Sequence, residues 1–191
     1  MPKINKTKYA ILGVLNLKPC SGYDIKKFCD ASITHFWNEN YGHIYPVLKQ
    51  LESDGWVTKN IETTEGKPPR NVYSITENGK NELVQWLMQE PEMPQHRYEF
   101  LLKMFFSNEI PFEKVIERLQ NSEEYCKGIL DVYREIQEKM MKHADESGIE
   151  SRFPYQYATL RYGILNVEAS LKWCTETIEY LQEFKNKKGR S

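Results

Sequence analysis

The stretch of residues 41–76 constrains this chain most, because a helical pattern is followed at once by a hairpin pattern. Pro46 suits the first turn of a helix that begins near Gly42, where a backbone N–H would lack a partner anyway. Gly55 is the residue type that ends helices in the left-handed conformation. Four apolar side chains at spacings i, i+3, i+4 and i+7 share the buried face: Ile44, Val47, Leu48 and Leu51.

Two short runs of β-branched and aromatic residues follow this helix. They bracket the sequence Gly-Lys-Pro-Pro-Arg, which is typical of a turn, and together they predict a β-hairpin. The tip of the hairpin carries Lys67 and Arg70, two cations on an exposed loop. The bracketing side chains are Trp56, Val57 and Ile61 before the turn, and Val72, Tyr73 and Ile75 after it.

Two further helices are predicted before this stretch. The first runs from Thr7 to Leu17 and stops at Lys18-Pro19. The second opens at Ser21-Gly22 and continues through Phe28. Three short helices followed by a hairpin have the order of a winged helix-turn-helix.

A fourth helix is expected over residues 77–88, with Thr76 as its N-cap. Pro91 and Pro94 then interrupt the chain, so we place the domain boundary there. The sequence predicts a mainly α fold with a small β-hairpin wing. It divides into a winged domain over residues 1–90 and an antiparallel helical dimerisation domain over residues 95–185.

The second half has the most regular helical periodicity in the chain. Its first apolar series predicts a helix of about 30 residues, roughly 45 Å long. After a break near Pro154, the last helix carries two apolar stripes. The first series is Phe112, Val115, Leu119, Cys126, Ile129, Tyr133, Ile136 and Met140; the first stripe of the last helix is Leu160, Ile164, Val167, Leu171, Cys174, Ile178 and Leu181; the second stripe is Tyr155, Ala158, Tyr162, Leu165 and Ala169.

A helix with two apolar stripes needs two partners, and a hairpin within one chain supplies only one. We expect the other partner to be a second subunit, which makes the protein a homodimer. We assign dimerisation to the first stripe, although either stripe could meet the second subunit. The alternative is that the short helix holding Phe100, Leu101, Met104 and Phe105 covers the second stripe.

Composition predicts a cytoplasmic protein with no membrane segment. The 191 residues contain no apolar run of 18 residues and no signal peptide, and the four cysteines form no CxxC pair. Cys20, Cys29, Cys126 and Cys174 are therefore expected to be free thiols in a reducing compartment.

The charge balance argues weakly against nucleic-acid binding. Residues 1–90 carry 11 Lys and Arg against 10 Asp and Glu, and residues 91–191 carry 15 against 17. A DNA-binding domain of this composition must concentrate its cations on one face. The candidate clusters, each explained equally well as solvated lysines, are Lys3, Lys6 and Lys8; Lys26 and Lys27; and Lys67 and Arg70.

Several runs in the first 88 residues resemble the PadR family of bacterial transcription regulators. These runs are LGVL at 12–15, SGYDI at 21–25, GHIYPVLKQLE at 42–52 followed by Gly55, and YSITENG at 73–79. The run EFLLKMFF at 99–106, with the helices after it, resembles the C-terminal dimerisation domain of the subgroup that includes the phenolic-acid-responsive repressor and the virulence activator type.

The resemblance implies a dimeric repressor that binds an inverted-repeat operator in double-stranded DNA and is released by an effector. The recognition helix then offers its first turn and outward face to the major groove, and the wing reaches the DNA backbone or minor groove. The alternative to a DNA contact for Tyr45 is a buried aromatic side chain in the core. Tyr23 is equally consistent with a core position. His43 stands where many members carry Ser. The expected DNA-binding residues are Tyr23, Gly42, His43, Tyr45, Pro46, Lys49, Lys67 and Arg70.

An effector site is expected near the domain junction, where aromatic residues are abundant, although aromatic stripes more often belong to a core. His96, Arg97 and Tyr98 are the candidate polar anchors for a small aromatic effector. We expect no enzyme, metal or cofactor, because the histidines lack metal spacing and no phosphate loop or nucleophile motif is present. The competing hypothesis is a helical protein-interaction adaptor whose winged domain does not bind DNA.

Overall fold

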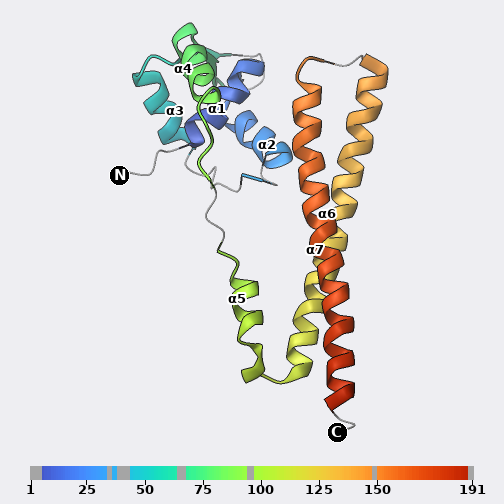
Figure 1. The fold of residues 1–191 in the computed structure, drawn as a ribbon. Helices are drawn as coiled ribbons and strands as arrows, with labels where there is room; N and C mark the ends of the chain where they lie inside the picture. The colour runs from blue at the N-terminus through green and yellow to red at the C-terminus, as the bar shows by residue number, and fades with distance from the viewer. Residues whose placement is uncertain are drawn as a thin grey trace. The chain divides into compact units, whose positions relative to one another are not determined.

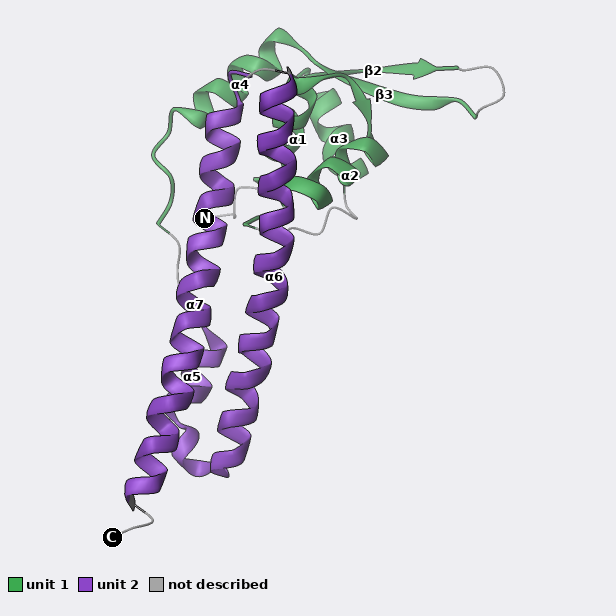
Figure 2. Ribbon diagram, turned by 90° about the vertical axis from the view of Figure 1, so that its right-hand side faces the viewer, with its two compact units in different colours: residues 1–94 green, residues 95–191 purple. Residues whose placement is uncertain are grey.

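The computed structural model describes residues 6–33, 36–37, 44–63, 68–93, 97–147 and 150–188 (Figure 1). The chain forms two compact units, residues 1–94 and 95–191 (Figure 2). The first unit holds α1 (Thr7–Leu17), β1 (Cys20–Ser21), α2 (Gly22–Ser32), α3 (Ile44–Ser53), β2 (Val57–Glu62), β3 (Arg70–Ile75) and α4 (Glu77–Leu87). The second holds α5 (Glu99–Phe105), the 3₁₀ turn η2 (Ser107–Glu109), α6 (Phe112–Ser147) and α7 (Phe153–Lys188).

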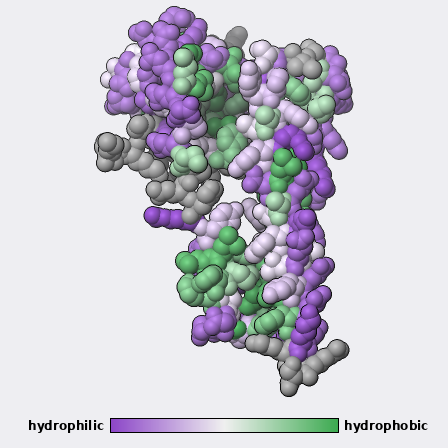
Figure 3. Space-filling view, viewed as in Figure 1, coloured by the Kyte–Doolittle hydropathy of each residue, from purple (hydrophilic) through white to green (hydrophobic). Residues whose placement is uncertain are grey.

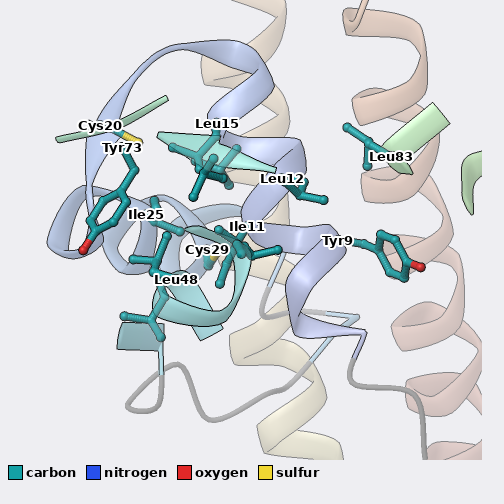
Figure 4. Close-up of a cluster of buried hydrophobic side chains, with 14 residues drawn as sticks. Tyr9, Ile11, Leu12, Leu15, Cys20, Ile25, Cys29, Leu48, Tyr73 and Leu83 are labelled. Atoms are coloured by element: carbon teal, nitrogen blue, oxygen red, sulfur yellow. The ribbon is translucent and has the colours of Figure 1, made fainter. Parts of the chain in front are cut away.

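The core of the first unit lies between its helices and its sheet (Figure 4). Ile11 and Leu12 of α1 are fully buried, as are Ile25 of α2 and Leu48 of α3. The predicted inward positions of the recognition helix are confirmed, with Ile44, Leu48 and Leu51 buried and Val47 packed against them. This packing fixes which face of α3 remains in solvent.

α3 ends where the sequence predicted, and the backbone shows why. Gly55 has a φ of 73°, a conformation that favours glycine. The Gly55 N–H donates to the Glu52 carbonyl at 3.1 Å, and the Trp56 N–H donates to the Leu51 carbonyl at 2.9 Å. These two bonds form a Schellman motif, which satisfies the last carbonyls of the helix and turns the chain into β2.

The hairpin is confirmed, and a third strand joins it. β2 and β3 pair antiparallel from Val57 opposite Ile75 to Glu62 opposite Arg70. β1 adds Cys20 opposite Tyr73 on the other side of β3, giving the order β1-β3-β2. Sequence reasoning missed β1 because two residues before a helix carry no period of their own.

Thr76 joins the end of the hairpin to α4. Its hydroxyl accepts from the Gly79 N–H at 3.1 Å, as expected of the predicted N-cap, and donates to the Gly55 carbonyl at 2.8 Å. Gly79 lies so close to β2 that an added Cβ would stand 2.1 Å from the Trp56 carbonyl oxygen. The Thr-Glu-Asn-Gly run thus packs the start of α4 against the backbone at the end of α3 and the start of β2.

The second unit is built on two antiparallel helices of 36 residues each, so the first is longer than the 30 residues predicted. Hydrogen bonds link the pair at several levels, including Thr175 to Glu123 at 3.1 Å and Gln137 to Tyr157 at 2.9 Å. Two buried clusters line the contact, one around Leu119 and Cys174 and one around Leu130, Tyr133 and Ile164. The side chains of all four cysteines are buried.

The first stripe of the last helix, which we assigned to dimerisation, packs against α6 within the same chain. Its members Leu160, Ile164, Val167 and Leu171 belong to one buried cluster with α6, and Cys174, Ile178 and Leu181 belong to the other. The stripe is therefore occupied before any second subunit is considered.

The second stripe stays in solvent within the chain. Tyr155, Tyr162 and Leu165 are 77%, 65% and 53% exposed. The alternative that the short helix covers this stripe is wrong, because Phe100 and Met104 of α5 pack instead on the cluster that contains Cys174. The second stripe thus lacks a partner among the described residues of the second unit.

Candidate nucleic-acid interface

The outward face of α3 carries the predicted contact residues that the structure describes. Tyr45 is 58% exposed, and Pro46 and Lys49 are exposed beside it. The core alternative for Tyr45 is therefore wrong. Gly42 and His43, also predicted to contact DNA, lie outside the described residues.

The ring of Tyr45 rests on Gly22 at the start of α2. A Cβ on Gly22 would stand 2.8 Å from Cε1 of that ring and 3.3 Å from Leu48. The missing side chain therefore brings the first turns of α2 and α3 together. Tyr23, the next residue, is 68% exposed, so its core alternative is also wrong.

A reciprocal capping box fixes the start of α2. The Ser21 hydroxyl accepts from the Asp24 N–H at 3.2 Å, and the Asp24 carboxylate accepts from the Ser21 N–H at 3.1 Å. The side-chain hydrogen bond from Ser21 is the main cause that lowers the pKa of Asp24 below its usual value. Asp24 therefore stays ionised beside the backbone N–H groups of this helix end.

Lys49 is the one cation within α3. It is exposed and forms no ion pair with the described part of the chain. A lysine that is not already neutralised can reach a phosphate or a guanine edge without first breaking an intramolecular contact.

Arg70 differs from the prediction in its position and in its ion-pair partners. It is the first residue of β3 rather than part of the loop. Its guanidinium contacts the Glu62 carboxylate at 2.6 Å and the Asp24 carboxylate at 3.7 Å. The hydrogen bond that the guanidinium donates to Glu62 is the main cause that raises the pKa of Arg70 above its usual value. Lys67, its predicted companion at the tip, lies outside the described residues.

The cation cluster at the N-terminus has a structural role. Lys6 pairs with Glu92 at 2.9 Å, and Lys8 lies 3.4 Å from Glu82, which also accepts from the Tyr9 hydroxyl at 2.9 Å. The Lys8 ammonium stands 4.6 Å from the ring centres of both Tyr9 and Trp56. These contacts tie the start of α1 to α4 and to the segment just after it, so this cluster is not a free cationic face. Lys3 lies outside the described residues.

The candidate effector residues precede α5. Arg97 and Tyr98 are exposed, Tyr98 by 65%, whereas His96 lies outside the described residues. Among the aromatic residues proposed for such a site, Trp173 packs edge-on against Phe100 at 5.8 Å and belongs to a buried cluster of the second unit. That aromatic pair therefore packs in the core, which is the alternative to a ligand-binding role for these aromatic residues.

Two family models together match most of the chain. The model of the transcriptional regulator PadR-like family matches residues 11–85, and the model named virulence activator alpha C-term matches residues 96–182. This chain is a PadR-like transcriptional regulator. The winged part and the long helix pair correspond to these two matches in turn.

Whole-chain relatives agree with this membership. The negative transcriptional regulator PadR of Bacillus subtilis is 28% identical over 87% of this chain and 92% of its own length. Its structure in complex with operator DNA matches at a TM-score of 0.81, with 27% identity over 92% of this chain and 98% of that one. The Vibrio cholerae virulence activator AphA matches at 0.73, with 28% identity over 93% and 98%.

A second structure of the Bacillus protein contains p-coumaric acid. It matches at a TM-score of 0.75, with 27% identity over 92% of this chain and 98% of that one. The PadR-like family comprises transcription regulators and not enzymes, which confirms the expectation that this chain is not an enzyme. Within the described residues, no helix of this PadR-like regulator is long and apolar enough to cross a membrane.

Proposed function

We propose that this PadR-like regulator acts in the cytoplasm as a homodimeric repressor that binds an inverted-repeat operator through α3. The observation that carries the proposal is the outward face of α3, where Tyr45 and Lys49 are exposed and the Tyr45 ring packs on Gly22, next in sequence to the exposed Tyr23 of α2. A relative with the same fold was crystallised with operator DNA. The first turn of α3 enters the major groove, and the exposed cation follows it.

In this proposal the start of α2 contacts DNA through a side chain rather than through its backbone N–H groups. The capping box engages two of the donors at this helix end, and Asp24 adds a negative charge that opposes a phosphate there. The Tyr23 hydroxyl remains free to reach a phosphate oxygen from the same turn. Gly42, His43 and Pro46 complete the proposed surface around the first turn of α3.

The wing contributes less through Arg70 than through Lys67. A phosphate that binds Arg70 must compete with Glu62 and Asp24, which already contact the guanidinium. Arg70 therefore holds β3 against β2 and α2 more than it attracts DNA. This assignment keeps Lys67 as the cation through which the wing reaches the backbone.

The regulator reads two half-sites as a dimer, with centres about 34 Å apart. Because α6 occupies the first stripe of α7, we place the dimer contact on the second stripe and on the exposed face of α5. Repression is proposed because the Bacillus relative is a negative regulator, although another match is an activator. A reporter fused to the bound promoter distinguishes repression from activation, since deleting a repressor raises reporter expression and deleting an activator lowers it.

We propose a small aromatic acid as the effector, anchored by His96, Arg97 and Tyr98. A cationic side chain and a phenol suit a carboxylate and an aromatic ring, and a relative was crystallised with p-coumaric acid. Adding p-coumaric acid to the preformed complex should release DNA, and Arg97→Ala should weaken that release. Release that is unchanged in the variant removes Arg97 from the site.

An anisotropy titration with the DNA upstream of the regulator's own gene tests the main proposal. Specific binding should be nanomolar, should survive competitor DNA, and should weaken as salt rises. The adaptor hypothesis predicts that the protein binds every promoter no more tightly than it binds competitor DNA. If the first promoter shows no specific binding, genome-wide site selection distinguishes the adaptor from a regulator with a remote operator.

A further inference from the structure

Three charged side chains meet where the wing approaches α2. Glu62 lies directly opposite Arg70 in the ladder of β2 and β3. Arg70 comes two residues before Val72, which pairs with Ser21, the N-cap of α2. The register therefore brings the Arg70 side chain between a carboxylate of β2 and the first turn of α2, where Asp24 lies. We call Asp24, Glu62 and Arg70 the Arg70 cluster.

The guanidinium of this cluster is already engaged by carboxylates. Nε and Nη2 of Arg70 each lie 2.6 Å from the same carboxylate oxygen of Glu62, and Nη1 lies 3.7 Å from an Asp24 carboxylate oxygen. The N–H donors of a guanidinium have a fixed planar arrangement. Donors directed at these two carboxylates are therefore not available to a phosphate.

The Arg70 cluster borders the surface that we propose for DNA. Asp24 follows the exposed Tyr23, and the Tyr45 ring of α3 packs on Gly22. The three side chains of the cluster are 40–57% exposed. Much of the visible surface of the first unit is hydrophilic (Figure 3). A phosphate that approached Tyr23 would meet these three charged groups as well.

A phosphate gains little from the guanidinium while both carboxylates are present. To bind Arg70 it must displace Glu62, which replaces one charge-assisted contact by another. The displaced carboxylate and Asp24 would then lie beside a phosphate of the same charge sign and repel it. The cluster therefore adds little to DNA affinity, although it contains an arginine.

We propose that Glu62, together with Asp24, keeps the Arg70 guanidinium from binding DNA phosphates and so lowers the affinity of the regulator for any duplex. This rests on the DNA binding proposed above and names groups that limit it. Phosphate contacts carry no sequence information and supply nearly all of non-specific binding. The cluster thus lowers sequence-independent affinity and leaves the base contacts of α3 unchanged.

The first test replaces Glu62, because Asp24 also caps α2. Glu62→Gln keeps the size of the side chain and removes its charge. Anisotropy titrations of the whole chain with a mixed-sequence duplex should show an affinity about three- to ten-fold higher at moderate salt. The slope of log affinity against log salt should steepen by about one for each subunit on the DNA, because one phosphate contact is added. A gain in affinity cannot arise from a loss of folding.

Glu77→Gln is the matched control for the change in net charge. Glu77 also forms an exposed ion pair within the first unit, with Lys80 at 2.7 Å. It follows the opposite end of β3 from Arg70, roughly 17 Å along the strand, which exceeds the Debye length of about 8 Å at physiological salt. This variant should leave the salt slope unchanged.

The double variant Glu62→Gln/Arg70→Gln tests whether the gain depends on the guanidinium. It has the same net charge as the unsubstituted protein and lacks the cation that Glu62→Gln makes available. Its affinity and its salt slope should therefore return to those of the unsubstituted protein.

The outcomes distinguish this role from the proposed function. An affinity of Glu62→Gln equal to or below that of the unsubstituted protein overturns the role of Glu62, and so does an unchanged salt slope. A double variant that binds more weakly than the unsubstituted protein, with a shallower slope, shows that Arg70 already contacts DNA and also overturns it. These results leave the regulator standing, provided that the unsubstituted protein prefers its own upstream region to the mixed-sequence duplex. A protein that binds neither duplex, with or without the substitutions, overturns both proposals.

Discussion

At the scale of single residues, small changes in chemistry decide which groups of the winged unit are available. Gly22 leaves room for the Tyr45 ring, which stays 58% exposed on the outward face of α3. Arg70 is a cation by sequence, but two carboxylates already surround it. Lys49, four residues after Tyr45, has no such neighbours among the described residues. The first unit is near neutral overall, and Lys49 is the one cation within α3, so the proposed contact face depends on this single positive charge.

Lys49→Ala should weaken operator binding and lower the slope of log affinity against log salt by about one, because one phosphate or base contact is lost. Anisotropy titrations at several salt concentrations measure both effects. Lys139→Ala, an exposed lysine of α6, is the control and should change neither. Equal affinity of the Lys49 variant and the unsubstituted protein at moderate salt would remove this residue from the interface.

Asp24→Asn should lower the free energy of unfolding by about 0.5–1 kcal/mol at pH 7, because the capping box loses its charged half. The pKa of Asp24 is lowered on folding, so its stabilisation is complete above the unfolded value of about 3.9 and is lost as pH falls through the lower folded value. Urea titrations should therefore show the two proteins converging in strongly acidic solution. A difference that stays constant down to low pH would mean that the charge does not matter.

At the scale of elements, hydrogen bonds at the helix ends connect the helices and the hairpin of the winged unit. The Schellman motif at Gly55 and the N-cap at Thr76 are joined by the bond from the Thr76 hydroxyl to the Gly55 carbonyl. The end of α3, the hairpin and the start of α4 therefore form one connected corner. A change at this corner acts on the wing and on α3 together.

Gly79→Ala should destabilise the protein by about 2–3 kcal/mol, because its Cβ would overlap the Trp56 carbonyl oxygen, which is backbone. Gly13→Ala is the matched control, since its added Cβ would meet no atom within 4 Å outside its chain neighbours and the backbone of its own helix, and it should stabilise α1 by about 0.5–1 kcal/mol. Thermal unfolding measures both. A Gly79 variant as stable as the unsubstituted protein would show that the corner adapts.

At the scale of the whole molecule, α7 packs on α6 with one face and leaves the opposite face exposed within the second unit. Ile164 is 2% exposed against α6, whereas its neighbour Leu165 is 53% exposed on the second stripe. The proposed dimer uses the second face, so folding of the helix pair and association of two copies depend on different residues.

Ile164→Ala should cost about 2–4 kcal/mol of unfolding free energy through the cavity it leaves between α6 and α7. Leu165→Ala should leave the stability of the helix pair nearly unchanged and weaken dimerisation. Urea titration and sedimentation equilibrium, run on both variants at matched concentration, distinguish them. The same loss of dimer in both would mean that the two faces are not independent.

The sequence by itself determined the local elements and the family. Apolar spacing located the helices of the winged unit, turn residues located the hairpin, and Gly55 and Thr76 located two helix ends. These signals are readable because a helix period, a cap or a left-handed residue is set by neighbours within a few positions. The outward direction of Tyr45 and Lys49 followed from the same spacing.

Only the tertiary structure decided which partners those elements meet. The ion pairs that hold Arg70, the two-residue strand β1 and the packing of the Tyr45 ring on Gly22 join residues that are distant in sequence. Both stripes of α7 repeat at helical spacing in the sequence, so periodicity alone did not show that α6 takes the first one. Periodicity records that a face is apolar, whereas the identity of what covers it is set by long-range packing.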